Sequence, residues 1–470
     1  MKFNRILAAV LSVICLSSCA DFLTEAPTTA LSEGTVYSDE ANLEAGVIGV
    51  YWSFKTSSYS WTTQIPEFGA YPSRLVVYKD NRTSNVQYTE SLTLSMWPTS
   101  VTNQGIYDYL YASIYKCNRM LESLPGSPVN QEFKNEIEGE VKFLRAWQYY
   151  AAARYWGDVP LILETSKTIE DTDVPRSHYV EVYKQILSDL EFAEQNMRTP
   201  ERVAEVGGMT GRPNRWAATA VKASVYMQIA CLIEHKEYQF FDYQSDPSRD
   251  CDFSSIGIST AEDAWKKCLE TAEKVINEGP YELAKSYADL FDWGPDKVDV
   301  YNLKERIFVL QNTREGAASN LSNRTLPQYW HTTTSNNNHG RFRPGRFPLW
   351  KWGTIHGGVP LTSNYGPNLF STVKDPRYEV SYIHSGYTNM NTGKNQSVWP
   401  KNFTSHTYYL PYFKKYADPT YDVSVTYADL YLVRFAEMYL IAAEAAASLS
   451  SGPGDAYWQK AMDHMEVLHK

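Results

Sequence analysis

The chain has 470 residues, of which 43% are hydrophobic and 21% charged, and its formal net charge is −10. This composition is typical of a globular protein with a sizeable core and excludes an intrinsically disordered chain. The acidic balance, without a run of Lys and Arg, argues against nucleic acid as a partner, because binding to phosphates requires clustered basic residues.

The first 18 residues have the pattern of a secretory signal. Two basic residues precede a short apolar run, which is shorter than the roughly 20 residues that span a bilayer. The segment Leu16-Ser17-Ser18-Cys19 resembles the bacterial lipobox, in which the cysteine is acylated and becomes the first residue of the mature protein. Several acyl chains would anchor the protein durably, whereas one chain binds only weakly. We expect a signal peptide at 1–18, lipid on Cys19 and a tether at 19–38, with no second segment that crosses a membrane.

Apolar residues then recur at helical spacing in several segments. We expect helices at residues 40–55, 104–123, 131–155, 177–197, 216–233, 260–277, 428–448 and 455–469. Ser177 and Thr260 are candidate N-caps, and Asp263 lies three residues after Thr260, as in a capping box. The segment 200–213 is rich in glycine, which predicts a loop.

These helical segments form pairs that are joined by short or medium loops, with small residues at the expected crossings. Repeated helix pairs are typical of tetratricopeptide-like stacking, whose unit is about 34 residues. The units are divergent and interrupted, so the pattern alone leaves a helical domain without repeats as an alternative. The fold class that we expect is mainly α, with tetratricopeptide-like helix pairs packed against a large irregular, loop-rich region.

The irregular region covers residues 300–427, which are rich in Asn, Gly, Pro, Thr and aromatic residues. Within it, the segment 306–311 predicts a strand. Loops lie at the surface, so their tryptophan and tyrosine side chains require an explanation other than core packing. We therefore treat 300–427, together with the irregular segment 56–103, as a candidate binding surface.

The cysteines left after the signal and the lipidated residue do not have the spacing of a zinc site. They are Cys117, Cys231, Cys251 and Cys268. Four cysteines permit three pairings, and the sequence does not choose among them. A cysteine within a helix is most often a small buried apolar residue. We expect no metal and no cofactor.

Several segments together resemble the SusD/RagB family of surface glycan-binding lipoproteins of Bacteroidota. The similar segments, in family order, are Asp21–Leu23 after the lipobox, Tyr111–Asn118, Glu140–Tyr150, Tyr155–Leu161, Gly211–Ala218, Asp375–Arg377 and Tyr431–Glu444. The family usually continues with a closing segment that is missing here. We therefore expect a C-terminus shorter than the family norm, either native or truncated.

This resemblance implies an outer-membrane location, with the protein lipid-anchored and exposed on the cell surface. It implies that the chain binds oligo- or polysaccharide and delivers it to a TonB-dependent transporter of the SusC type. It also implies an N-terminal helical-repeat region at 39–299 and a C-terminal region with binding loops at 300–470.

Sugars present flat C–H faces and a rim of hydroxyls, so a loop aromatic ring beside Asn or Arg forms a suitable contact. Two sets of loop residues have this character. The first is Trp61, Tyr71, Arg74, Asn81 and Arg82, and the second is Trp330, Asn336, Asn338, Trp350 and Trp352. We predict that residues of both sets converge on one exposed surface.

Other candidate residues are better explained without a ligand. Trp147 and Trp216 lie in helical stripes and are expected in the core. Asp463 and His464 are expected on a solvated helix surface.

Two other functions remain open from the sequence. One is a helical-repeat scaffold that binds envelope proteins or peptides, and the weaker one is a glycoside hydrolase. Hydrolysis needs two facing carboxyl groups about 5–9.5 Å apart, and no motif organises such a pair. Hydrolase and metalloprotease motifs are also missing. We expect a binding protein and not an enzyme.

Overall fold

The computed structural model describes residues 37–54, 61, 101–166, 173–205, 212–235, 251–292, 303–311 and 428–469, and several short pieces between 76 and 415. The described part is mainly helical, as predicted. Its long helices are α3 (Glu40–Ser53), α6 (Val101–Ser123), α7 (Gln131–Trp156), α8 (Tyr179–Asn196), α10 (Arg215–Glu234), α11 (Ala261–Glu278), α14 (Phe435–Leu449) and α15 (Ala456–His469). The short helices are α9 (Pro200–Glu205), α13 (Pro376–Ser381) and the 3-10 turns Leu124–Gly126, Ser254–Ile256 and Asp289–Phe291.

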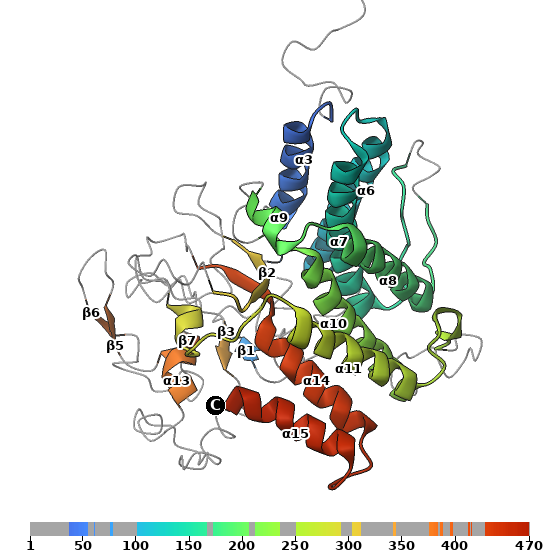
Figure 1. Ribbon diagram of the computed structural model, residues 1–470. Helices are drawn as coiled ribbons and strands as arrows, with labels where there is room; N and C mark the ends of the chain where they lie inside the picture. The colour runs from blue at the N-terminus through green and yellow to red at the C-terminus, as the bar shows by residue number, and fades with distance from the viewer. Residues whose placement is uncertain are drawn as a thin grey trace, which may run out of the picture.

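The helices pack on one another in chain order. Helix α6 contacts α7, α7 contacts α8, α8 contacts α10, α10 contacts α11, α11 contacts α14, and α14 contacts α15. Figure 1 shows this succession from α3 and α6 at the top to α15 at the bottom, with the strands at one side. Stacking of neighbouring helix pairs is the arrangement of tetratricopeptide-like repeats, which confirms the predicted fold class.

Short antiparallel strand pairs accompany the helices. The pairs are β1 (Val76–Tyr78) with β3 (Phe342–Pro344), β2 (Arg306–Leu310) with β8 (Leu430–Arg434), β4 (Tyr382–Ile383) with β7 (Tyr412–Phe413), and β5 (Gly386–Thr388) with β6 (Asn395–Ser397). The strand predicted at 306–311 is confirmed as β2. Each pair joins segments of the loop-rich region to one another or to the rest of the chain.

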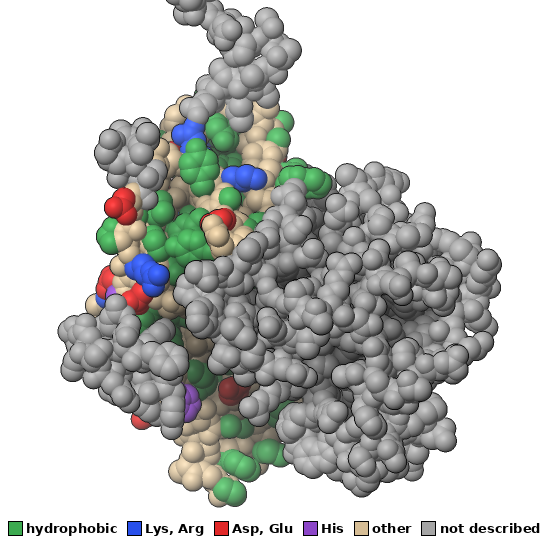
Figure 2. All heavy atoms as spheres, turned by 180° about the vertical axis from the view of Figure 1, so that it is seen from behind, with side chains coloured by type: hydrophobic (Ala, Val, Ile, Leu, Met, Phe, Trp, Pro, Cys, Tyr) green, Lys and Arg blue, Asp and Glu red, His purple; other side chains and the backbone are tan. Residues whose placement is uncertain are grey.

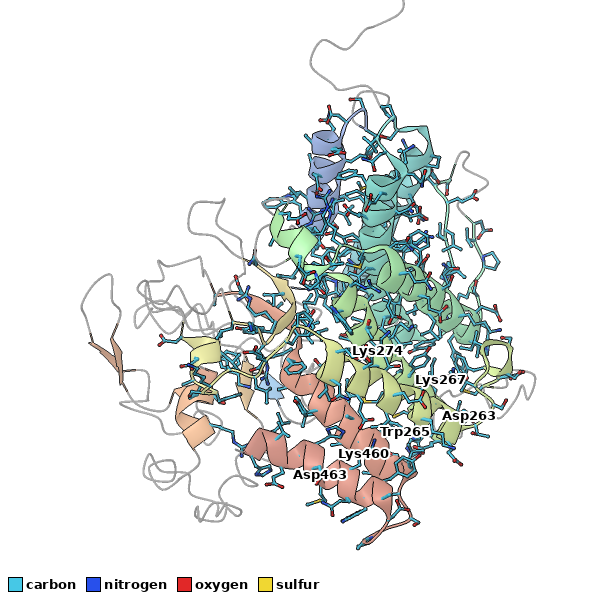
Figure 3. The ribbon with its side chains drawn as sticks, in the orientation of Figure 1. Asp263, Trp265, Lys267, Lys274, Lys460 and Asp463 are labelled. Carbon is cyan, nitrogen blue, oxygen red and sulfur yellow. The ribbon has the colours of Figure 1, made fainter. Side chains whose placement is uncertain are left out.

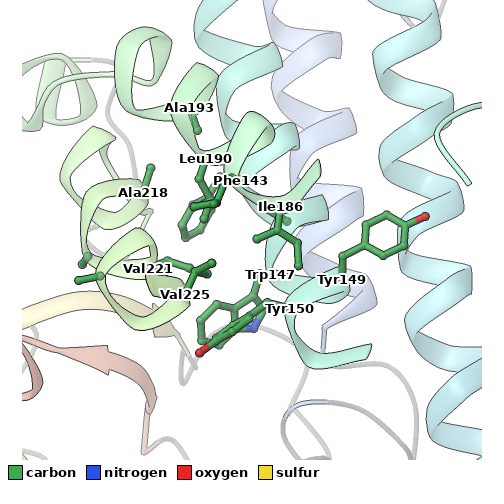
Figure 4. Packing of buried hydrophobic residues seen from close by; sticks show 14 of the residues in the cluster. Phe143, Trp147, Tyr149, Tyr150, Ile186, Leu190, Ala193, Ala218, Val221 and Val225 are labelled. Carbon is green, nitrogen blue, oxygen red and sulfur yellow. The ribbon is translucent and has the colours of Figure 1, made fainter. Parts of the chain in front are cut away.

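The core runs between α7, α8 and α10. Phe143 and Trp147 of α7 meet Ile186 and Leu190 of α8, with Val221 of α10 opposite (Figure 4). Helix α10 buries several alanines, which lets the neighbouring backbones approach closely. It is long and apolar enough to cross a membrane by composition alone, contrary to our expectation for the sequence, but most of it is buried among the other helices. Its apolar character is explained by the core.

Side-chain caps fix where several helices begin. The capping box predicted for α11 is present, because Thr260 accepts from the Asp263 backbone N–H at 3.1 Å while the Asp263 carboxylate accepts from the Thr260 N–H at 2.9 Å. Figure 3 labels Asp263 at this end of α11. The N-cap of α8 is His178 and not Ser177. Ser177 instead donates its backbone N–H to Val159, in an isolated bridge.

Two predicted boundaries were wrong. The predicted loop 200–213 begins with helix α9, because Pro200 occupies the first helical position, where its missing N–H is no loss, and Thr199 accepts from the Arg202 N–H at 3.3 Å. The helix predicted from 428 begins only at Phe435, since Leu430–Arg434 pairs with β2. A short apolar run fits either structure, and the partner strand decides.

A glycine of α7 controls how closely α8 can approach. A Cβ on Gly139 would lie 2.9 Å from the Met197 backbone nitrogen, whereas one on Gly49 of α3 would meet nothing within 4 Å. We expect Gly139→Ala to lower the free energy of unfolding by about 1–3 kcal/mol through overpacking. The matched control Gly49→Ala should raise it by about 0.5–1 kcal/mol. Urea denaturation of both variants checks this, and shifts in the same direction would contradict it.

Candidate functional site

The loop-rich region is closed at its base by β2 and β8. These strands pair antiparallel, with Arg306 opposite Arg434 and Leu310 opposite Leu430. Two ion pairs hold the junction: Arg306 donates to Asp429 at 2.5 Å, and Arg434 donates to Glu305. The chain therefore leaves the helical scaffold after β2 and returns to it before β8 at one place.

The charges of this base are buried. Asp429 is 0% exposed and Glu305 2% exposed, and Glu305 also accepts from the Ala284 backbone N–H at 2.7 Å. Burial raises the pKa of the neighbouring Tyr431 to about 12, so its hydroxyl stays protonated and donates to the Leu290 carbonyl at 3.0 Å. The buried acids of the base are thus engaged in ion pairs and hydrogen bonds within the protein.

An aromatic cluster lies beneath the base. The Phe308 ring of β2 is 5.0 Å from Phe143, 5.3 Å from Trp147 and 6.4 Å from Phe54, measured between ring centroids. Trp61 extends this cluster, with its ring 5.1 Å from Trp147 and stacked on Phe54 at 6.4 Å. These rings connect α3, α7 and β2, and they carry the base of the loops.

Trp61 is the one predicted glycan contact among the described residues. It is partly buried, and its indole N–H donates to the Gln148 amide oxygen at 2.9 Å. The other predicted contacts lie outside the described residues: Tyr71, Arg74, Asn81, Arg82, Trp330, Asn336, Asn338, Trp350 and Trp352. So does the predicted lipid site, Cys19. The role of all of them stays a prediction.

The pairing of β1 with β3 bears on these two sets. Val76 lies opposite Pro344, and Tyr78 lies opposite Phe342. In the sequence, the first predicted set flanks β1 on both sides and the second set flanks β3. The ladder therefore brings the two segments of the chain side by side, although they are more than 250 residues apart.

A second polar network lies within the helices and explains a recognisable sequence motif. Arg145 of α7 donates from Nε and Nη2 to both carboxylate oxygens of Asp189 on α8, at 2.8 Å each, and from Nη1 to Asn118 of α6 at 2.9 Å. The side chains of Arg145 and Asp189 are 6% and 2% exposed. The arginine of the motif Glu140–Tyr150 thus ties three helices together.

A third network joins α3 to the segments before α9 and α10. Arg212 donates to both oxygens of Glu140 at 2.7 Å, and Tyr51 donates its hydroxyl to Glu140 at the same distance. Glu44 accepts from Arg198 and Arg212. Burial alone would raise the pKa of Glu44, but the hydrogen bonds and charges of the two arginines outweigh it and hold that pKa below its ordinary value.

Three expectations for single residues can be compared with the structure. Trp147 is buried, as predicted, whereas Trp216 is only partly buried at the packed surface of the core. Asp463 is exposed on α15 (Figure 3), as predicted. His464 is not solvated: its side chain is 14% exposed and its Nε2 lies 2.9 Å from Glu273 of α11. Lys460 of α15 donates to the same glutamate at 3.0 Å, so two side chains of α15 reach α11 at this point.

None of the four remaining cysteines is joined in a disulfide in the described part of the chain. Cys117 and Cys268 are buried in helices, in agreement with the prediction of small apolar residues. Burial raises the pKa of the Cys117 thiol to about 12, so it stays protonated and unreactive. None of the three pairings that the sequence left open is therefore formed.

Comparison with known proteins gives a consistent result. A family model described as "Starch-binding associating with outer membrane" matches residues 21–227, and one described as "SusD family" matches residues 301–468. A SusD-like protein of Formosa agariphila is 26% identical over 301 residues, which cover 62% of this chain and 49% of that protein. The chain thus spans about half the length, or less, of the curated relatives it matches.

Solved structures show the same fold. A SusD-like protein of Bacteroides fragilis superposes with a TM-score of 0.65 at 18% identity, over 95% of this chain and 81% of that chain. A SusD-like carbohydrate binding protein of the same species superposes with a TM-score of 0.63 at 17% identity, over 87% of this chain and 74% of that chain.

Proposed function

The chain belongs to the SusD/RagB family, and from this premise we propose that it binds oligo- or polysaccharide at the cell surface without cleaving it. We further propose that Cys19 carries lipid, that the protein lies on the outer membrane, and that it hands the glycan to a TonB-dependent transporter. Family members are described as starch-binding and associated with the outer membrane, which supports carbohydrate binding at that membrane.

The observation that carries this proposal is that two strand pairs, β2–β8 and β1–β3, connect the loop-rich segments. The β2–β8 pair attaches the loop-rich region to the helices. The β1–β3 ladder pairs the irregular segment 56–103 with the loop-rich region. Rings beside amide and guanidinium groups would offer the shallow, mixed surface that a glycan requires. We propose the site at the two flanking sets, from Trp61 to Arg82 and from Trp330 to Trp352.

The buried carboxylates support a binding role over hydrolysis. Among the described residues, the buried acids are Glu136, Glu140, Asp189, Glu305 and Asp429. Each of them accepts a hydrogen bond from an arginine. A glycosidase needs two carboxyl groups that face each other across the scissile bond, and acids engaged in ion pairs are poorly suited to that task.

The helical half of the surface favours a protein partner as well. Ile48 and Trp52 of α3 and Tyr115 of α6 are large apolar residues that are about half exposed. Figure 2 shows hydrophobic side chains at the end of the molecule where these helices lie. Exposed apolar residues of this kind are typical of docking surfaces, and the transporter is the partner that we propose.

Alanine at both Trp330 and Trp350 is expected to weaken glycan affinity about tenfold or more, because each stacked ring contributes on the order of 1 kcal/mol. Calorimetry against a panel of soluble polysaccharides first identifies a ligand. Calorimetry with that ligand then measures the affinity of each variant. At Trp61 we choose Phe in place of Ala, since the ring also packs on Phe54. The control Trp458→Ala removes an exposed tryptophan of α15.

The expected result is a loss of affinity in the loop variant with none in the control. Unchanged affinity in the loop variant would refute this location for the site. Release of reducing sugar by the purified protein would refute the non-catalytic role.

A further inference from the structure

A polar hollow lies on the helical scaffold between α7, the end of α8 and α9. Its volume is about 630 Å³, within the range of small-molecule sites, roughly 300–1,000 Å³. Glu132, Asn135 and Glu136 line it from α7, and Arg198 and Arg202 line it from the other side. The short helix α9 forms one of its walls through Glu201, Arg202 and Glu205.

Arg198, which lines the hollow, has a buried donor that is not used. Arg198 is 3% exposed in its side chain and donates from Nε to Glu136 at 2.9 Å and from Nη2 to Glu44. Its Nη1 is buried and has no hydrogen-bond partner. A buried donor without an acceptor is costly, so a shift of the Arg198 side chain that brought Nη1 to a hydroxyl or a water in the hollow would be favourable.

The rim offers both donors and acceptors. Arg215 lines the hollow, and among the described residues none accepts a hydrogen bond from its guanidinium. Arg202 is 42% exposed and shares Glu136 with Arg198. Acceptors on the same rim are the exposed carboxylates of Glu132 and Glu201.

This mixture of charges favours a neutral ligand over an anion or a cation. An anion would meet the rim carboxylates, and a cation would meet the arginines, so either ion is repelled from one side. A neutral molecule with many hydroxyls suits both, because each hydroxyl donates to a carboxylate or amide oxygen and accepts from a guanidinium.

We propose that this hollow is a second saccharide site, separate from the aromatic loops, that holds a neutral segment of the glycan by hydrogen bonds alone. The proposal rests on the proposed function, since it assumes a carbohydrate ligand. A chain held at two places would leave more slowly than one held at the loops only.

Met197 provides a probe, because it lines the hollow and is 4% exposed. We would label the methionine methyl groups of the full chain with ¹³C and follow them by NMR. Neutral trisaccharides of glucose, xylose and mannose would be added, with citrate and spermidine as ionic comparisons. Met438, which is buried in α14, is the internal control.

We expect at least one neutral trisaccharide to shift the Met197 signal saturably, with Met438 unmoved and with no response to either ion. Gln195 and Arg215 both line the hollow, so the double variant Gln195→Ala/Arg215→Ala should weaken this response at least fivefold. The matched control Lys266→Ala/Gln459→Ala, on α11 and α15, should leave it unchanged.

Three outcomes would overturn the proposal. If calorimetry detects a glycan while Met197 stays unmoved, the hollow is refuted and the loop site survives. If citrate or spermidine shifts Met197 instead, the hollow is an ion site. If no sugar of either panel binds by any measurement, both this inference and the proposed function fail.

Discussion

Replacing Asp189 with alanine is expected to lower the free energy of unfolding by about 3–5 kcal/mol. The reason is the fate of Arg145, whose guanidinium lies between three helices and would lose its counter-charge. Both side chains are more than nine-tenths buried, so water cannot replace the carboxylate. Gln185 would also lose its bond of 2.9 Å to the same carboxylate. Urea denaturation followed by circular dichroism measures the change.

Two controls make this prediction specific. Glu181→Ala removes an ion pair with Lys184 on the same helix, where the glutamate is 57% exposed, and should change stability by less than about 1 kcal/mol. The double variant Arg145→Met/Asp189→Leu removes both charges and should be more stable than Asp189→Ala alone. If Asp189→Ala behaves like Glu181→Ala, the network does not hold the helices together.

Phe308→Ala is expected to lower the free energy of unfolding by about 3–5 kcal/mol, the range for removing a buried ring. The ring is 0% exposed and contacts aromatic side chains of α3 and α7. Because Phe308 is part of β2, its loss should also loosen the base of the loops. We expect faster proteolysis within 312–427 and weaker glycan binding, at a temperature where the helices remain folded.

The companion variant Phe308→Leu keeps most of the volume and should change stability by no more than about 1.5 kcal/mol. Its proteolysis should resemble that of the unchanged protein. If Phe308→Ala is destabilised but is cleaved within 312–427 no faster than the unchanged protein, the β2–β8 pair does not hold the loops. That result would contradict the role given to β2.

Local patterns in the sequence were sufficient for the long helices. Helix α11 was predicted because Thr260 and Asp263 mark its start and an apolar stripe follows. Helix α9 was missed because the glycines after residue 206 favour a loop, although Thr199-Pro200 is a helix start signal. A loop prediction that rests on composition can therefore miss a short helix of six residues.

Tertiary partners decided the rest. The apolar run that begins at Leu430 fits a helix or a strand, and the partner that decides, β2, lies more than 100 residues earlier. Trp61 was chosen as a loop aromatic, but its contacts to Phe54 and Trp147 come from segments that only the fold brings together. His464 was read as solvated for the same reason, because Glu273 belongs to another helix.

The adjacent exit and return of the chain at β2 and β8 has a consequence for how such proteins diversify. A segment whose two attachment points are neighbours can be lengthened, shortened or exchanged as a cassette without moving any helix, because loop length changes the closure entropy only slowly. A change of ligand would then leave the polar network around Arg145 and the stacked helices unchanged, while the exchanged segment carries the new selectivity.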